Sequence, residues 1–128
     1  MIVLDTHAWL WWTSGSTKLS IKAKETCDTA DALLVSAISL WEVAMLVSRD
    51  RLGLDRDVDV WLRQALALPQ IRLEPLSPSI AVQSTRLPGE FHGDPADRII
   101  VATALESGAT LVTRDKRIHS WGRVKTVW

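Results

Sequence analysis

The fold is decided by residues 93–115, which read GDPADRIIVATALESGATLVTRD. Asp94 is a typical residue to cap the N-terminus of a helix, and Pro95 suits the first helical position. Gly108 suits the C-terminal end of the same helix. Thr110–Thr113 is β-branched and apolar, which predicts a short buried strand. The stretch therefore predicts a helix that leads directly into a strand.

The lengths of this predicted helix and strand place acidic residues close together. From Asp97 to Ser107 the helix advances roughly 15 Å, at about 1.5 Å per residue. From Thr110 to Asp115 the strand returns roughly 16 Å, at about 3.3 Å per residue. Because the two advances nearly cancel, we expect Asp97 and Asp115 at the same edge of the fold. Asp94, as the cap of the helix, is expected there too.

The rest of the chain alternates short apolar runs with segments that have a helical pattern. Ser39–Glu42 has the S-x-x-E pattern of a capping box, which predicts that a helix begins there. Alternating strands and helices favour right-handed crossovers and a parallel sheet. The predicted fold is a three-layer α/β/α sandwich with a central parallel sheet of four to five strands. Further strands are expected at Ile2–Leu4, Leu33–Val35, Ile71–Leu73 and Val124–Val127, and further helices at Thr6–Trp12, Ser20–Thr29, Ser39–Arg51, Asp57–Leu66, Ser77–Leu87 and Arg114–Ser120.

The composition favours one globular domain that spans residues 1–128. Of the 128 residues 47% are hydrophobic, so the chain can bury a substantial core. The formal net charge is zero, which argues against a polybasic chain. A single cysteine, Cys27, excludes a disulfide framework and a cysteine-based zinc site. Asp5 lies too early for a signal peptide, and Glu42 interrupts the longest apolar region, so we expect no membrane span and a cytoplasmic location.

Five acidic residues are expected to meet at one edge of the predicted sheet. The carboxyl ends of parallel strands share an edge, and binding sites form there. Two carboxylates about 4 Å apart repel by roughly 4 kcal/mol at an effective dielectric near 20, so protonation or a bound cation must compensate. Oxygen ligands without cysteine favour Mg²⁺ or Mn²⁺, which suits hydrolytic cleavage of nucleic acid. The five residues are Asp5, Glu42, Asp94, Asp97 and Asp115.

Most of these acids also have an explanation that needs no metal. Glu42 can complete the capping box, and Asp94 can be a plain helix cap. Asp97, in the first turn of its helix, is favoured by the helix dipole, and Asp115 can be a turn residue. The alternative to a nuclease is therefore a non-catalytic α/β binding module with structural acids. A nucleotide-binding fold is disfavoured, because no glycine-rich loop follows Asp5.

Four short motifs resemble those of a known family. They are LDTH at 4–7, SAISLWE at 36–42, DPADR at 94–98 and LVTRD at 111–115. Together they resemble the PIN domain, and most of all the VapC-type toxins of toxin–antitoxin modules. The resemblance spans nearly the whole chain, with the motifs in family order. It implies a ribonuclease that depends on Mg²⁺ or Mn²⁺ and is held inactive by a cognate, VapB-like antitoxin.

The resemblance also implies roles for individual residues. Asp5, Glu42 and Asp97 correspond to the three core acids that hold the metal. Asp115 corresponds to the more variable fourth acid, which completes that site or helps to hold a second ion. Asp94 belongs to the pattern of the subgroup and is less securely a ligand. Hydroxyl groups near these acids are matched by Thr6, Ser39 and Thr113.

Basic and aromatic residues suggest contacts with RNA and with protein partners. Most of the seven tryptophans are expected in the core, and the remainder are candidates for an antitoxin groove or a homodimer interface. His7 and His92 are expected near the acids, in supporting rather than ligand positions. Candidates for contact with RNA phosphates are Arg98, Arg114, Lys116 and Arg117.

Overall fold

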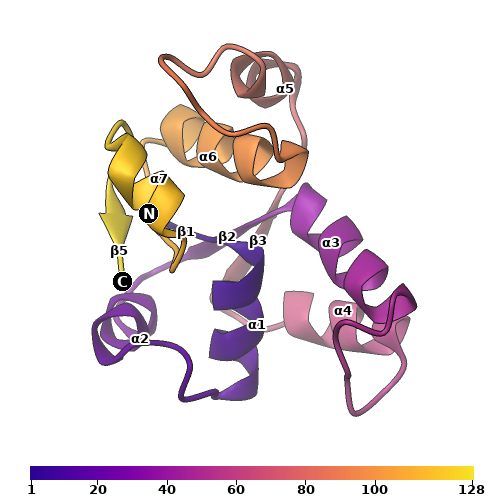
Figure 1. Cartoon of the computed structure of the whole chain (residues 1–128). Coiled ribbons are helices and arrows are strands. Elements are labelled where there is room, and N and C mark those ends of the chain that lie inside the picture. Colours follow the sequence, from indigo (N-terminus) through magenta and orange to yellow (C-terminus); the bar gives the residue numbers. More distant parts are fainter.

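A computed structural model describes all of residues 1–128, and it contains one parallel five-stranded sheet (Figure 1). The strand order is β3-β2-β1-β4-β5, so β1 is central, and every neighbouring pair is parallel. The predicted α/β sandwich with a parallel sheet is thus confirmed, at the upper end of the expected strand number. The strands are β1 (Ile2–Leu4), β2 (Leu33–Ser36), β3 (Ile71–Glu74), β4 (Thr110–Val112) and β5 (Thr126–Val127).

Two hydrophobic cores lie on opposite faces of the sheet, because successive side chains of a strand point to opposite sides. Val3 and Leu111 pack in the core that contains Ile100 of α6, whereas Leu4 and Val112 pack in the core that contains Trp9 of α1. The pairing places Val3 beside Leu111 and Leu4 beside Val112, so each face is continuous across neighbouring strands.

The helices are divided between these two faces, as Figure 1 shows. α5 and α6 cover one face, whereas α1, α2 and α4 lie across the other, and α3 packs at the side against α6 and α4. None of the helices is long and apolar enough to cross a membrane. The helices are α1 (Thr6–Ser14), α2 (Ile21–Asp28), α3 (Ala37–Ser48), α4 (Val58–Leu66), α5 (Pro78–Ser84), α6 (Pro95–Ser107) and α7 (Lys116–Trp121).

The unit at residues 93–115 forms as predicted. The Asp94 side chain accepts from the Asp97 backbone N–H, and Pro95 begins α6. Gly108 ends the helix with φ +61°, a left-handed conformation that favours glycine. Because β4 follows directly, its C-terminal end returns to the edge of the sheet where α6 began.

The prediction that a helix begins at Ser39 is wrong. α3 begins at Ala37, and its N-cap is Ser36, whose hydroxyl accepts from the Ile38 N–H at 3.3 Å. Ser39 is fully buried one turn into the helix and contacts Thr6 instead. A capping box therefore does not explain Glu42, whose carboxylate accepts a hydrogen bond from the Thr6 hydroxyl.

Candidate metal centre

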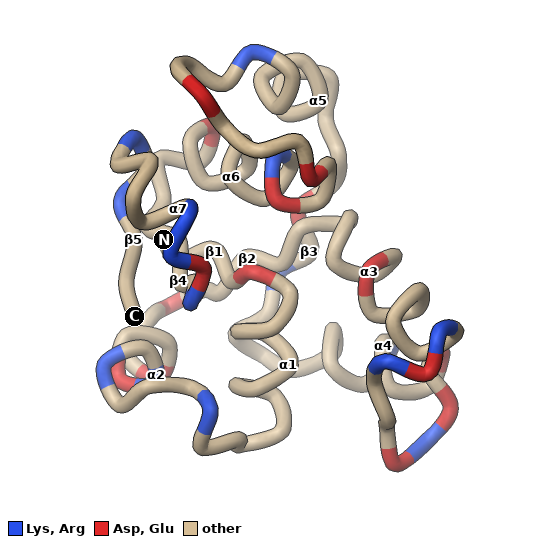
Figure 2. The backbone as a smooth tube through the Cα atoms, in the orientation of Figure 1, with Lys and Arg blue, Asp and Glu red and all other residues tan.

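A cleft of about 510 Å³ opens at the carboxyl edge of the sheet, where α1, α6 and α7 begin. Figure 2 shows acidic and basic positions alternating in this region. All five acids predicted from the sequence line the cleft, although they come from four separate segments of the chain. The other lining residues are Thr6, His7, Trp11, Arg114, Lys116 and Arg117.

Asp5 connects the central strand to the cleft. It follows β1 directly and caps α1, since its Oδ1 accepts from the Ala8 N–H at 2.8 Å. Burial raises the pKa of Asp5, and hydrogen bonds from Thr113 and Ala8 only partly oppose this effect. Burial therefore disfavours the ionised carboxylate of Asp5, and a cation held nearby would stabilise it.

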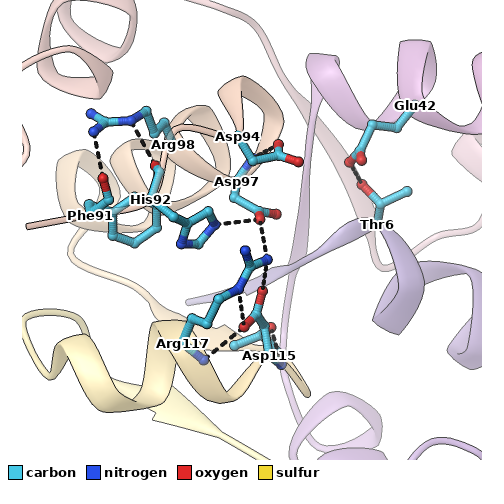
Figure 3. A network of polar contacts seen from close by, with 10 residues as sticks. Thr6, Glu42, Phe91, His92, Asp94, Asp97, Arg98, Asp115 and Arg117 are labelled. Carbon is cyan, nitrogen blue, oxygen red and sulfur yellow. Dashed lines mark hydrogen bonds and ion pairs between the residues drawn. The ribbon is translucent and has the colours of Figure 1, made fainter.

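Glu42 is held by the Thr6 hydroxyl, which in turn contacts the Ser39 hydroxyl, and both hydroxyl groups were predicted to support the site. Thr6 donates to Glu42 Oε1, and the Thr6 and Ser39 hydroxyl oxygens lie 2.9 Å apart. Burial raises the pKa of Glu42, the Thr6 bond lowers it, and the charges of Asp97 and Asp94 raise it further. In Figure 3 the Glu42 carboxylate lies across the cleft from the acids of α6.

Asp97 and Asp115 lie side by side with His92. His92 Nε2 is 2.7 Å from Asp97 Oδ2, and one ligand atom of each of the three residues lies within 4.8 Å of the others. Burial raises the pKa of Asp97, against the hydrogen bond from His92, and the neighbouring charges of Asp94 and Asp115 add to the rise. The length argument from the sequence thus placed Asp97 and Asp115 correctly.

Arg117 neutralises part of this acidic group. Its Nη2 lies 3.0 Å from Asp115 Oδ2 and 3.5 Å from Asp97 Oδ2, as Figure 3 shows. Partial burial acts to raise the pKa of Asp115, but bonds from the Arg117 side chain and backbone N–H outweigh it, so the pKa is lowered. A guanidinium group therefore bridges two of the carboxylates that would hold a metal ion.

The donor set fits a divalent cation. At 4.8 Å, two negative charges repel by about 3.5 kcal/mol at an effective dielectric near 20. Asp5, Glu42 and Asp97 all have a raised pKa because burial disfavours their charged forms. Several carboxylate oxygens in a cleft open to water match the preference of Mg²⁺ or Mn²⁺, and a single nearby imidazole is compatible with Mn²⁺.

The remaining acidic candidate, Asp94, and the remaining hydroxyl candidate, Thr113, also lie in or beside the cleft. Asp94 lines it with one oxygen committed to capping α6. Thr113 is fully buried at the end of β4, and its hydroxyl accepts from the Asp115 N–H at 3.1 Å. These bonds support the positions of the neighbouring acids, and neither depends on a metal.

Arg98, the first of the four residues predicted to contact RNA, does not line the cleft. Its guanidinium donates to the backbone carbonyls of Ser84, Phe91 and His92 at 2.8–3.1 Å and lies 5.7 Å from the Phe91 ring centroid. Arg98 thus fastens the loop before α6 to that helix. Arg114 and Lys116, by contrast, line the cleft as expected.

Two interactions had no signal in the sequence. The first is the ion pair of Arg117 with Asp97, because no local spacing brings α7 against the start of α6. The second involves His119, whose ring lies 2.7 Å from the Thr113 carbonyl oxygen and 2.8 Å from the Thr126 hydroxyl. His119 thereby fixes the end of β4, the strand that carries Asp115 into the cleft.

A parallel sheet and a carboxylate-lined cleft at its strand ends place the chain in a class of α/β proteins with an acidic site at the sheet edge. Within this class the chain belongs to the PIN domain family, whose model matches residues 2–124. It is 41% identical over 129 residues to a protein named Ribonuclease VapC22 from Mycobacterium tuberculosis, covering 99% of this chain and 98% of the relative.

Solved structures share the fold at lower identity. FitAcB from Neisseria gonorrhoeae superposes with a TM-score of 0.71 at 22% identity and covers 100% of this chain and 97% of that chain. VapC20 from Mycobacterium tuberculosis, described as a sarcin-ricin loop cleaving toxin, superposes with a TM-score of 0.72 at 17% identity and 98% coverage of both chains. These similarities establish the architecture around the cleft.

Proposed function

We propose that this chain is a metal-dependent endoribonuclease toxin that hydrolyses RNA phosphodiester bonds and is neutralised by a cognate antitoxin. The observation that carries the proposal is the meeting of Asp5, Glu42, Asp97 and Asp115 in one cleft. The name of the 41% identical relative, Ribonuclease VapC22, supports the same activity. Structural acids alone, as in a binding module, would not need three carboxyl groups whose pKa is raised by burial.

The four carboxylates would hold Mg²⁺ or Mn²⁺, with Asp94 available at the same cleft. A bound divalent ion supplies an activated water and neutralises charge on the phosphate and on the leaving oxygen. Thr6 and His92 hold the carboxylates of Glu42 and Asp97 through hydrogen bonds, so that both are positioned before substrate arrives.

The basic residues of the cleft would attract the RNA backbone. Arg114 and Lys116 line the cleft and make no ion pair, so their charges are available for phosphate groups. Arg117 is committed to Asp115 and Asp97 in the metal-free protein. Its guanidinium therefore lies next to two of the carboxylates that would hold the ion.

The partner proposal rests on relatives and on exposed apolar surface. Solved neighbours include a toxin–antitoxin complex from Klebsiella pneumoniae and VapBC2 from Rickettsia felis. Trp41 of α3 is 58% exposed, and Val82 of α5 is 45% exposed, which provides apolar surface for an antitoxin or for a second copy in a homodimer.

The test is cleavage of total RNA by the purified chain with Mg²⁺ or Mn²⁺, followed by sequencing of the new ends. We expect discrete cuts that EDTA prevents and that Asp5→Asn abolishes, since asparagine keeps the α1 cap but removes a ligand charge. Asp59→Asn is the matched control, because Asp59 is exposed on α4 and pairs with Arg63. Undiminished metal-dependent cleavage by Asp5→Asn would refute the assignment.

The binding-module alternative is tested separately by Mn²⁺ titration. A metal site raises the melting temperature in proportion to the logarithm of the ion concentration above its dissociation constant. A melting temperature that does not respond to Mn²⁺ would favour the non-catalytic module.

A further inference from the structure

Trp11 is the one aromatic side chain among the residues that line the acidic cleft, apart from the imidazole of His7. It lies one turn after His7 on α1, and their ring centroids are 5.6 Å apart. Trp128 packs edge-on against Trp11, with centroids 5.8 Å apart and planes at 60°. The Trp11 ring is therefore held in place by protein on one side while it borders the cleft.

The neighbouring tryptophans of α1 have different surroundings. Trp9 is fully buried and packs edge-on against Trp61. The Trp12 indole N–H donates to Asp28 at 3.1 Å, and Trp12 does not line the acidic cleft, although both Trp11 and Trp12 border a second cavity beside α2. The Trp11 indole N–H has no protein partner and is not buried, so Trp11 combines a fixed ring with a free donor.

A free cation lies over the same ring. The Arg114 guanidinium carbon is 5.9 Å from the Trp11 ring centroid, and this side chain makes no hydrogen bond or ion pair. Arg114 is exposed and lines the cleft, and its contact with Trp11 is a cation–π contact, so the guanidinium must leave this ring face when a base stacks on it. An aromatic face beside an unpaired arginine is the combination with which proteins hold a base and its adjacent phosphate.

We propose that Trp11 is a stacking platform for one unpaired RNA base beside the bond that is cut, with Arg114 on the adjacent phosphate. This inference rests on the proposed function, because the substrate must place a phosphate at the acids of the same cleft. It requires an unpaired base at this position, since a paired base inside a helix cannot present its face to a side chain. The positive charges of Arg114 and Lys116 favour a nucleic acid over an apolar peptide at this position.

The test uses a short synthetic single-stranded RNA that spans a cut made by the wild-type chain in total RNA. Steady-state cleavage is measured for wild type, Trp11→Phe and Trp11→Leu, on the intact RNA and on versions with one abasic nucleotide at each position near the cut. Stacking on an aromatic side chain contributes enough to predict a rise of about tenfold in KM for Trp11→Leu, with a smaller change for Trp11→Phe.

The abasic substrates separate stacking from a structural role of Trp11. One abasic position should raise KM for wild type but cause no further rise in Trp11→Leu, because the ring and the base form one interaction. Trp12→Leu, the control from the adjacent position, should respond to that abasic position as wild type does. Additive effects, or equal KM values for wild type and Trp11→Leu, would overturn the stacking inference while leaving the nuclease intact.

Two other outcomes are also decisive. If wild type makes no metal-dependent cut, the proposed function fails first, and the inference fails with it. If Trp11→Leu cleaves every RNA as wild type does but loses binding to its antitoxin, Trp11 belongs to a protein interface instead.

Discussion

Arg98 provides a sharp test of a side chain whose position differs from the sequence prediction. Its guanidinium donates three hydrogen bonds, to the carbonyl oxygens of Ser84 at 3.1 Å, Phe91 at 2.8 Å and His92 at 3.0 Å. Arg98→Ala removes all three donors and leaves part-buried carbonyls to be solvated by water or left without a partner.

The expected cost follows from these contacts. At about 1 kcal/mol for each net hydrogen bond, Arg98→Ala should lower the free energy of unfolding by about 3 kcal/mol. This is a large share of the roughly 5–15 kcal/mol typical of a small domain. At about 4 °C for each kcal/mol, the melting temperature should fall by roughly 12 °C.

The assay is urea and thermal unfolding of the purified chain without RNA. Arg98→Lys should recover only part of the loss, because one ammonium group cannot reproduce the planar, forked donors of a guanidinium. Arg114→Ala is the matched control, since the exposed Arg114 side chain makes no hydrogen bond and only a cation–π contact with Trp11, so this variant should lose less than about 1 kcal/mol. If Arg98→Ala unfolds like wild type, or if Arg98→Lys restores stability completely, the structural role of Arg98 is refuted.

Three further substitutions test the cleft. Arg117→Gln should tighten Mn²⁺ binding several-fold in a calorimetric titration, because the guanidinium occupies the space between two carboxylates. Asp5→Asn should raise the melting temperature of the metal-free protein by several degrees at neutral pH. Burial raises the pKa of Asp5, so the stability present with the protonated group is lost as pH rises through the folded-state pKa, and the advantage of asparagine should vanish near about pH 4. Thr6→Val should lower the free energy of unfolding by about 1–2 kcal/mol in urea at neutral pH, since it leaves part-buried Glu42 without its donor.

For each of these three substitutions, one result would contradict the expectation. Weaker Mn²⁺ binding by Arg117→Gln would show that the guanidinium supports the site instead of competing with the ion, and Arg114→Gln controls for the loss of one positive charge. A melting temperature of Asp5→Asn below that of wild type at neutral pH would mean that the ionised carboxylate stabilises the fold. An unchanged unfolding curve for Thr6→Val would show that water replaces the hydroxyl at Glu42.

Much of the fold was predictable because its signals are local. The cap Asp94, the stop at Gly108 and the apolar run of β1 all act within a few residues, and the structure contains each of them. The placement of Asp97 near Asp115 followed from the lengths of one helix and one strand. Because the strands are parallel, Asp5 after β1 and Glu42 after β2 also lie at this carboxyl edge of the sheet.

The errors arose where distant segments decide the outcome. Both Ser36 and Ser39 are suitable caps, and the choice depends on where β2 stops pairing with β3, which the local pattern does not contain. The hydrogen bonds of Arg98 had no local signal, because Ser84 is the last residue of α5 and Phe91 lies in the loop between α5 and α6. Arg117 meets Asp97 only after the sheet has brought α7 beside α6.

The most direct measurement of the central claim is anomalous diffraction from crystals of the wild-type chain soaked in Mn²⁺. The account predicts an anomalous peak in the cleft, within bonding distance of carboxylate oxygens from Asp5, Asp97 or Asp115, with the Arg117 guanidinium displaced from its present position. A cleft without such a peak at saturating Mn²⁺, with Arg117 still bridging the two acids, would contradict the account.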